Sequence, residues 1–225
     1  MTQEPIPLAD QTPFSRGGNR LCFVHPRNPH RCLKVLNPTS TPELKRQDKG
    51  FPANLRPLRY FDENLQEYAA LEAIHRNYPE EIRRHLPKTY GIVLTDLGHA
   101  HEVDLIRDRD GRIGETLEQY LWNKGLDRTV ERSMDTFAGD WLAGALPTRA
   151  LLPHNIVIRH MDQGAVLILI DGYGRKPSFK MPRFWSRMTS RKTLKDFKSR
   201  VDIVLKRKKD GEIAKPRISI LERSM

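Results

Sequence analysis

The stretch that most constrains what this chain can fold into is residues 151–174, LLPHNIVIRHMDQGAVLILIDGYG. Its apolar runs predict two short strands, at 156–159 and 165–170, separated by polar residues that favour a turn. Asn155 directly precedes the first strand and Asp171 directly follows the second. We therefore expect a small hairpin that carries both side chains at its open ends, and oxygen ligands of this kind suit Mg²⁺.

Length and composition predict one domain, or one domain in two lobes, for 225 residues. A hydrophobic content of 38% supplies a core and excludes wholesale disorder. The longest apolar run, VLILI, is far shorter than the ~20 residues that cross a bilayer. The sequence opens without a basic start or an apolar signal core, so the expected location is the cytoplasm, with a peripheral place at a membrane left open.

The two cysteines, Cys22 and Cys32, lie ten positions apart in two apparent strands and could face each other across a hairpin. Because no secretory signal is present, we predict free, buried thiols in preference to a disulfide. No CxxC pair or clustered His and Cys spacing indicates a zinc site.

The net charge of +11 is unevenly distributed along the chain. Residues 172–225 carry 17 Lys and Arg against 5 Asp and Glu, whereas the rest of the chain carries 22 against 23. The basic excess therefore belongs to the C-terminal quarter alone. Such a local excess predicts attraction to an anionic partner and carries no information about the fold.

The N-terminal part predicts a hairpin. Gly17 and Gly18 favour a turn, and apolar strands follow at 21–24 and 31–36, with a turn rich in Pro and Asn between them. Lys34 is the one charge inside the second strand. Taken alone, it is expected on the solvent face, since successive side chains of a strand point to opposite faces.

A helix is predicted over 60–77, with Asp62 as its cap and Glu67 on the same helical face as Glu63. Two strands at 89–95 and 99–106 follow it. The predicted apolar stripe of the helix at 60–77 consists of Leu65, Tyr68, Leu71 and either Ile74 or His75.

The remaining elements are mostly helical. The polar run RDRDGRIG at 107–114 predicts a hinge between lobes. A short helix at 115–122 and a longer one at 127–146 come next, and Pro147 ends the second. Beyond the hairpin, one amphipathic helix with a Lys and Arg face precedes a polar tail.

The predicted fold class is thus α+β, with two lobes. A loose arm spans 1–12, a lobe with an antiparallel sheet and one main helix spans 13–106, and the hinge spans 107–114. A reduced, mostly helical lobe spans 115–207, and a basic tail spans 208–225.

This order of elements resembles a protein-kinase-like fold. More narrowly, the chain resembles the YrbL family, the PhoP regulatory network proteins, which are small bacterial proteins with a kinase-like fold. The match covers roughly residues 13–180. The motifs that carry it are GNRLCFVHP at 18–26 with CLKV at 32–35, GIVLTDLG and DLIRDRDG within 91–111, LxPxNIV at 151–157, and DGYG at 171–174.

The resemblance implies an ATP site. Lys34 would reach the α- and β-phosphates, Glu67 would be its partner on the helix, and Gly17 and Gly18 would turn over the phosphates. A buried lysine needs a carboxylate nearby to stay charged. Phosphoryl transfer asks mainly for positioning and for neutralisation of charge, so these residue types fit that chemistry.

The resemblance also implies a magnesium site at Asn155 and Asp171. The chain departs from protein kinases in its catalytic loop. The usual catalytic loop reads HRDLKPxN, and placing its Asn on Asn155 puts Ala150 where the catalytic Asp belongs. Leu152 then occupies the place of the lysine that steadies the transferred phosphate. Because Ala150 cannot accept a proton and Leu152 carries no charge, ordinary kinase chemistry is expected to be impaired, and no catalytic base is assigned.

Three functions stay open at this point. The chain could be an atypical phosphotransferase, in which Asp140, Asp162 or His154 orients the acceptor, although each has a plainer role as a surface acid, a turn residue or a loop residue. It could instead be a pseudokinase-type regulator that acts through protein contacts, which the loss of both loop residues favours.

The third function is binding of the basic C-terminal quarter to an anionic surface. The candidates are a membrane or lipopolysaccharide, with nucleic acid ranked lower because no nucleic-acid motif accompanies the charge. Phe184, Trp185 and Phe197 alternate with the basic residues, a composition that suits a membrane interface. The plainer reading is a helix packed on the core with a solvated basic back.

Overall fold

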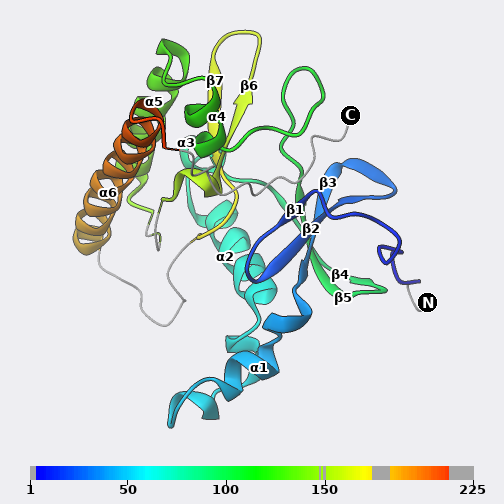
Figure 1. Cartoon of the computed structure of the whole chain (residues 1–225). Coiled ribbons are helices and arrows are strands. Elements are labelled where there is room, and N and C mark those ends of the chain that lie inside the picture. The colour runs from blue at the N-terminus through cyan, green and yellow to red at the C-terminus, as the bar shows by residue number, and fades with distance from the viewer. Residues whose placement is uncertain (1–3, 147, 149–150, 174–182, 213–225) are drawn as a thin grey trace. The chain divides into compact units, whose positions relative to one another are not determined.

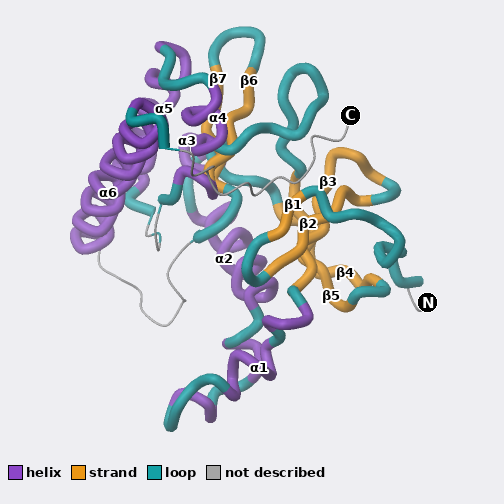
Figure 2. The backbone as a smooth tube through the Cα atoms, in the orientation of Figure 1, coloured by secondary structure: helices purple, strands orange, loops and turns teal. Residues whose placement is uncertain are grey.

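The computed structural model describes residues 4–146, 148, 151–173 and 183–212. Internal contacts divide the chain into two compact units (Figures 1 and 2). The first comprises the described residues up to Glu72 together with Lys88–Leu105. The second comprises Ala73–Pro87 and the described residues from Ile106 onward. The sequence predicted residues 73–87 as part of the first lobe. In the structure they group with the second unit.

The first unit is built on an antiparallel sheet with the strand order β1-β2-β3-β5-β4 (Figure 2). The predicted α+β class and the predicted hairpins are confirmed. The strands are β1 (Ser15–Arg16), β2 (Arg20–His25), β3 (Asn28–Leu36), β4 (Thr89–Thr95) and β5 (Gly98–Asp104).

The register of the sheet decides which side chains share a face. Cys22 of β2 lies opposite Lys34 of β3, which in turn lies opposite His101 of β5. Directly opposed residues point to the same face, so these three form a row across the sheet. Leu33 and Val35 flank Lys34 in the chain and therefore point to the other face.

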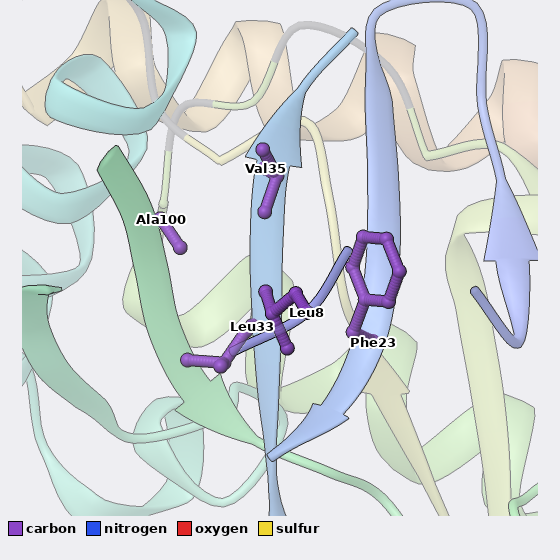
Figure 3. Packing of buried hydrophobic residues seen from close by; sticks show 5 residues of the cluster. All are labelled: Leu8, Phe23, Leu33, Val35 and Ala100. Atoms are coloured by element: carbon purple, nitrogen blue, oxygen red, sulfur yellow. The ribbon is translucent and has the colours of Figure 1, made fainter. Parts of the chain in front are cut away.

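That other face carries an apolar cluster (Figure 3). Phe23, Leu33, Val35 and Ala100 are at most 2% exposed, and Leu8 is fully buried against them. One strand, β3, thus supplies both the core on one side and Lys34 on the other. The sheet is buried on both faces at this strand, so the expectation that Lys34 points to solvent is wrong.

The prediction of a loose arm over residues 1–12 is wrong for the part of this segment that the structure describes. The amide of Ile6 donates to the carbonyl of Leu94 at 2.9 Å. The carboxylate of Asp96 accepts hydrogen bonds from the amides of Leu8 at 2.8 Å and Ala9 at 3.1 Å. Residues 6–9 are therefore fixed beside β4. One buried leucine and three hydrogen bonds donated by backbone amides hold the segment there despite its polar composition.

Replacing Leu8 by Ala tests this attachment. A fully buried leucine truncated to alanine costs about 2–5 kcal/mol of unfolding free energy, from lost transfer and from the cavity. We expect urea unfolding of Leu8→Ala to show a loss in that range. The matched control is Leu55→Ala, at a leucine that is 71% exposed, for which we expect almost no change. Equal effects of the two substitutions would contradict the packing of the arm.

Short helices precede the main helix of this unit, in a stretch where the sequence showed no clean period. They are η1 (Pro38–Ser40), α1 (Pro42–Gln47), η2 (Ala53–Leu55) and η3 (Leu58–Tyr60). The main helix is α2 (Glu63–Asn77). Asp62 caps it as predicted, since its Oδ1 accepts from the amides of Asn64 at 2.9 Å and Leu65 at 3.1 Å.

The buried face of α2 differs from the predicted stripe. Leu71 and Ile74 are buried as expected, but Leu65 is 38% exposed. The positions one and two turns before Leu71 on the buried face are the polar residues Glu67 and Asn64, which are 7% and 1% exposed. A search for apolar periodicity misses this face because its first half is polar.

The second unit is mostly helical, with one hairpin. Its elements are α3 (Glu80–Arg83), α4 (Leu117–Asn123), α5 (Arg128–Gly144), η4 (Pro153–Asn155), β6 (Ile156–His160), β7 (Ala165–Leu169) and α6 (Arg183–Lys209). The core forms around α5, where Phe137 stacks on Trp141 with ring centroids 4.9 Å apart. The ring centroid of Phe197, on α6, lies 6.0 Å from that of Phe137.

The polar run 107–114, predicted as a hinge, is a turn bonded to β6 in the second unit. Arg107 forms a bridge with Ile113, and Asp108 accepts a hydrogen bond from the amide of His160 at 2.8 Å. A Cβ on Gly114 would lie 2.6 Å from Val157, so glycine allows close approach there. Its role as a hinge stays a prediction. Of the predicted tail, residues 213–225 lie outside the described part of the chain.

Candidate functional site

The first candidate site is a buried ion pair between a strand and a helix. Lys34, near the C-terminal end of β3, and Glu67, on α2, are 6% and 7% exposed. The Nζ of Lys34 lies 2.5 Å from Oε1 of Glu67. The structure therefore brings together the two residues that the sequence analysis paired, and the pairing depends on the polar half of the buried face of α2.

Arg20 is a member of this site that the sequence analysis missed. It begins β2, two residues after Gly18, and is 8% exposed. Its Nη1 donates to Oε2 of Glu67, so the two oxygens of one carboxylate serve two cations. The one signal in the sequence was strand alternation, because Arg20 lies two positions before Cys22 in the same strand and so shares its sheet face.

The charges of this group follow from its surroundings. Burial by itself would raise the pKa of Glu67, but Arg20 and Lys34 hold that pKa well below its ordinary value. His101 is fully buried, and burial lowers its pKa, so it is neutral at pH 7. Its Nδ1 lies 3.5 Å from Oε1 of Glu67, and its Nε2 lies 2.8 Å from Oγ1 of Thr89.

Hydrogen bonds from side chains hold α2 and the glycine turn in place around this group. The amide of Asn64 donates to the backbone carbonyl of Lys34 at 2.8 Å. Asn19, next to the glycine pair, donates to Glu63 at 2.9 Å and accepts from Ser40 at 2.8 Å. The helix is thereby fixed to β3 one turn from Glu67, which keeps the carboxylate facing the lysine.

Gly17 and Gly18 lie in the turn between β1 and β2. The amide of Gly17 donates to the carbonyl of Arg20 at 2.8 Å, which closes the turn. Among the described residues, a Cβ on Gly18 would meet no atom within 4 Å, so this backbone is open to approach. The glycines thus lie three and two residues before the buried Arg20, and their role over phosphates stays a prediction.

Both cysteines are free, as predicted, and they lie on the same sheet face as Lys34. A hydrogen bond from the thiol of Cys32 lowers the pKa of Cys22, and Lys34 and Arg20 lower it further against the effect of burial. The same hydrogen bond and burial raise the pKa of Cys32. The thiolate form is therefore concentrated on Cys22, which is also the more exposed of the two.

Alkylation should show this asymmetry. We expect iodoacetamide at pH 7 to label Cys22 faster than a free cysteine and to label Cys32 far more slowly, because the thiolate is the nucleophile. Mass spectrometry of timed digests separates the two sites. Cys32→Ser should slow the labelling of Cys22, since the bond that lowers its pKa is weakened. Equal rates at both cysteines would contradict the assignment.

The ion pair makes a prediction for stability. Replacing Glu67 by Ala leaves two buried cations without their shared carboxylate, so we expect a loss of about 3–5 kcal/mol in unfolding free energy. Glu63→Ala on the same helix, where the carboxylate is 30% exposed, should cost less than about 1 kcal/mol. Urea unfolding measures both, and similar losses would argue against a central role for Glu67.

The same pair fixes the sign of a pH effect. Because the folded pKa of Glu67 is lower than its ordinary value of 4.5, its contribution is present above pH 4.5 and is lost as pH falls through the folded pKa. We expect Glu67→Gln to be less stable than the natural chain at pH 7 and to approach it at lower pH. A difference that stays constant with pH would refute this.

The second candidate site is at the open end of the hairpin in the second unit. Asn155 ends η4 and precedes β6, and the amide of Ile170, which follows β7, donates to its carbonyl at 2.8 Å. Asp171 comes next and accepts from the amide of Gly172 at 2.6 Å. The structure thus brings Asn155 and Asp171 to one end of the hairpin, both partly exposed, as the sequence analysis expected.

The chemistry of this end fits a hard cation. A carboxylate and an amide supply two oxygen ligands, and Mg²⁺ in proteins commonly completes its shell with water and substrate phosphates. Over the part of the chain that the structure describes, no group of three His, Cys, Asp or Glu forms a metal site. A metal held by Asn155 and Asp171 would complete its shell with water and with oxygens of a ligand.

The residues named as alternative acceptor-orienting groups lie elsewhere. Asp140 accepts hydrogen bonds from Arg84 and from Nε2 of His85, the latter at 2.9 Å. Asp162 is 90% exposed in the turn between β6 and β7, at the opposite end of the hairpin from Asp171. His154 lies 3.6 Å from Glu118.

The loop position that would carry a catalytic base falls outside the structure. Ala150 lies outside the described residues, as does Gly174 at the end of the DGYG quartet. Leu152 is partly buried at the start of η4. The departure from the kinase loop therefore stands on the sequence alone.

The protein is of the α+β class and has two units. The first contains a five-stranded antiparallel sheet with a buried Lys–Glu pair, and the second is helical, with a hairpin that carries Asn155 and Asp171. The chain matches the family described as PhoP regulatory network protein YrbL over residues 6–203 and belongs to that family. The resemblance stated from the motifs is therefore confirmed.

Individual relatives agree with this membership. The proteins named YrbL from Escherichia coli and Shigella flexneri are each 25% identical to this chain over 179 residues. The matches cover 75% of this chain and 73% of each relative. Among solved structures, the chain is similar to a kinase domain of PknI from Mycobacterium tuberculosis, a double mutant, with 16% identity and a TM-score of 0.39. That match covers 79% of this chain and 66% of the other.

Proposed function

We propose that this protein is a kinase-like protein that binds ATP with Mg²⁺ and that transfers phosphate weakly or not at all. The observation that carries the proposal is the buried contact between Lys34 and Glu67, 2.5 Å between Nζ and Oε1. Burying a charged lysine in a sheet core costs free energy, and its pairing with a carboxylate offsets that cost. Binding the phosphates of a nucleotide is a task that suits a lysine held charged by a helix carboxylate.

The cationic character of this site supports an anionic ligand. Arg20 and Lys34 share Glu67, and His101 beside them is neutral. The pKa of Glu67 lies well below its ordinary value, so the carboxylate stays ionised and keeps both cations oriented. Under the proposal, Lys34 binds the phosphates and Arg20 fixes the carboxylate that positions it.

The metal side of the proposal rests on Asn155 and Asp171. When bound, Mg²⁺ would neutralise phosphate charge, and these two residues would supply oxygen ligands to it. Their placement is fixed by the hairpin register, in which Ile156 lies opposite Leu169, and by the bond from Ile170 to the carbonyl of Asn155.

Weak or absent transfer is proposed from the residues near the loop. Ala150 cannot act as a base. Asp140 is already bound by Arg84 and His85, and Asp162 lies at the far end of the hairpin. The chemistry left to the chain is binding, positioning and charge neutralisation, which favours a regulatory role through protein contacts over turnover.

Thermal unfolding tests nucleotide binding. We expect ATP with Mg²⁺ to raise the melting temperature of the natural chain, with about 2.7 kcal/mol of stabilisation at a ligand concentration one hundred times Kd. Lys34→Met should lose this shift, because the phosphates lose their cation. The matched control Lys192→Met, at an exposed lysine of α6, should keep it. An equal shift in both variants would contradict the role of Lys34.

Turnover measurements separate the regulator from the enzyme. We expect purified protein with ATP and Mg²⁺ to release or transfer phosphate at a rate far below that of an active kinase. Asp140→Asn should leave the residual rate unchanged, since that carboxylate is held by Arg84 and His85. Fast transfer to an added acceptor would contradict the regulatory role and would require a catalytic base.

A further inference from the structure

The long helix α6 has one face buried in the second unit. Ser190, Leu194, Phe197, Val201 and Val204 are each at most 9% exposed and recur at spacings of four and three residues. This face packs against α4 and α5, and Figure 1 shows α6 running beside α5. No helix of the described chain is long and apolar enough to cross a membrane. Because the buried face of α6 packs against α4 and α5, its opposite face is turned to solvent.

The outward face of α6 is strongly basic. Residues 183–209 contain 11 Lys and Arg against two Asp. Nine of those basic residues are exposed, and both acids, Asp196 and Asp202, share the solvent side with them. A density of positive charge this high on one element favours an anionic partner.

Large apolar side chains are exposed on the same face. Trp185 is 56% exposed, Met188 is 46% exposed and Ile203 is 49% exposed. At 3.6 residues per turn, Trp185 and Ile203 are five turns apart and point in the same direction. Met188 and Lys192 follow Trp185 by three and seven residues, Lys195 follows Met188 by seven, and Lys206 follows Ile203 by three. Basic and apolar side chains therefore form one stripe.

This combination selects the partner. Charge alone would suit the phosphates of nucleic acid, which gain nothing from Met188 or Ile203. A lipid bilayer uses both, because lysines bind anionic headgroups while tryptophan and aliphatic side chains enter the boundary between headgroups and acyl chains. We propose that the outward stripe of α6, from Trp185 to Lys206, docks the protein flat on a bilayer of anionic phospholipids.

The docking surface is independent of the proposed nucleotide site. It contains neither Lys34 nor Asn155 nor Asp171, and its buried face forms part of the second unit alone. Loss of vesicle binding with nucleotide binding intact, or the reverse, therefore distinguishes failure of one proposal from failure of the other.

Sedimentation of the full chain with vesicles tests the proposal. We expect binding to vesicles of phosphatidylcholine mixed with phosphatidylglycerol and none to phosphatidylcholine alone. The charge-reversed double variant Lys192→Glu with Lys195→Glu should bind at least about 25-fold more weakly, from roughly fivefold or more per lysine. The control is Lys49→Glu with Lys88→Glu, which makes the same change of net charge at exposed lysines of the first unit and should bind as the natural chain does.

Two further measurements decide between lipid and other anions. Trp185→Ala keeps every charge and should weaken vesicle binding severalfold, whereas unchanged binding would overturn the lipid assignment. Salt raised from 0.05 to 0.5 M should release most of the protein. Equal binding to neutral vesicles, equal loss in the control variant, or duplex DNA displacing the protein from vesicles would each overturn the proposal. Melting temperatures of the variants confirm that they are folded.

Discussion

The structure of the first unit depends on placing one carboxylate inside a sheet-and-helix core together with two cations. Removing a charge from water costs several kcal/mol, so Glu67 is stable there only because Arg20 and Lys34 each bind one of its oxygens. The register of β2 against β3 and the rotation of α2 bring the three side chains together. The apolar cluster on the opposite sheet face, with Leu8 and Phe23, stabilises the same strands from the other side.

The two candidate sites are built by different means. The Lys34 site arises from strand alternation combined with a helix whose buried face is half polar, whereas the Asn155 and Asp171 site arises from the ends of a short hairpin. The first is held within its unit by side-chain hydrogen bonds from Asn64 and Asn19, and the second by a backbone hydrogen bond from Ile170 to Asn155. Under the proposed function, this separation allows the chain to keep the residues assigned to phosphate and metal binding while Ala150 and Leu152 stand where a kinase loop carries its Asp and Lys.

Much of this arrangement was predictable from the sequence. Strand alternation, the Asp62 cap and the apolar stripe of α5 place the main elements within a few residues. Arg20 escaped prediction because a charge at the start of a strand is ordinarily solvated, and its burial depends on Glu67, 47 residues away. Leu65 was placed on the buried face of α2 because apolar spacing cannot reveal a polar buried stripe. The anchored segment at 6–9 depends on Asp96, a long-range contact that local composition does not encode.

The central claim is that Lys34 binds phosphate while Asp171 acts through a metal. Calorimetric titration of ATP into the natural chain and the Asp171→Asn variant, each with and without Mg²⁺, tests it most directly. The account predicts that Mg²⁺ raises ATP affinity in the natural chain and that Asp171→Asn loses this increase while keeping the metal-free affinity. An equal effect of Mg²⁺ on both proteins, or no ATP binding by the natural chain, would contradict it.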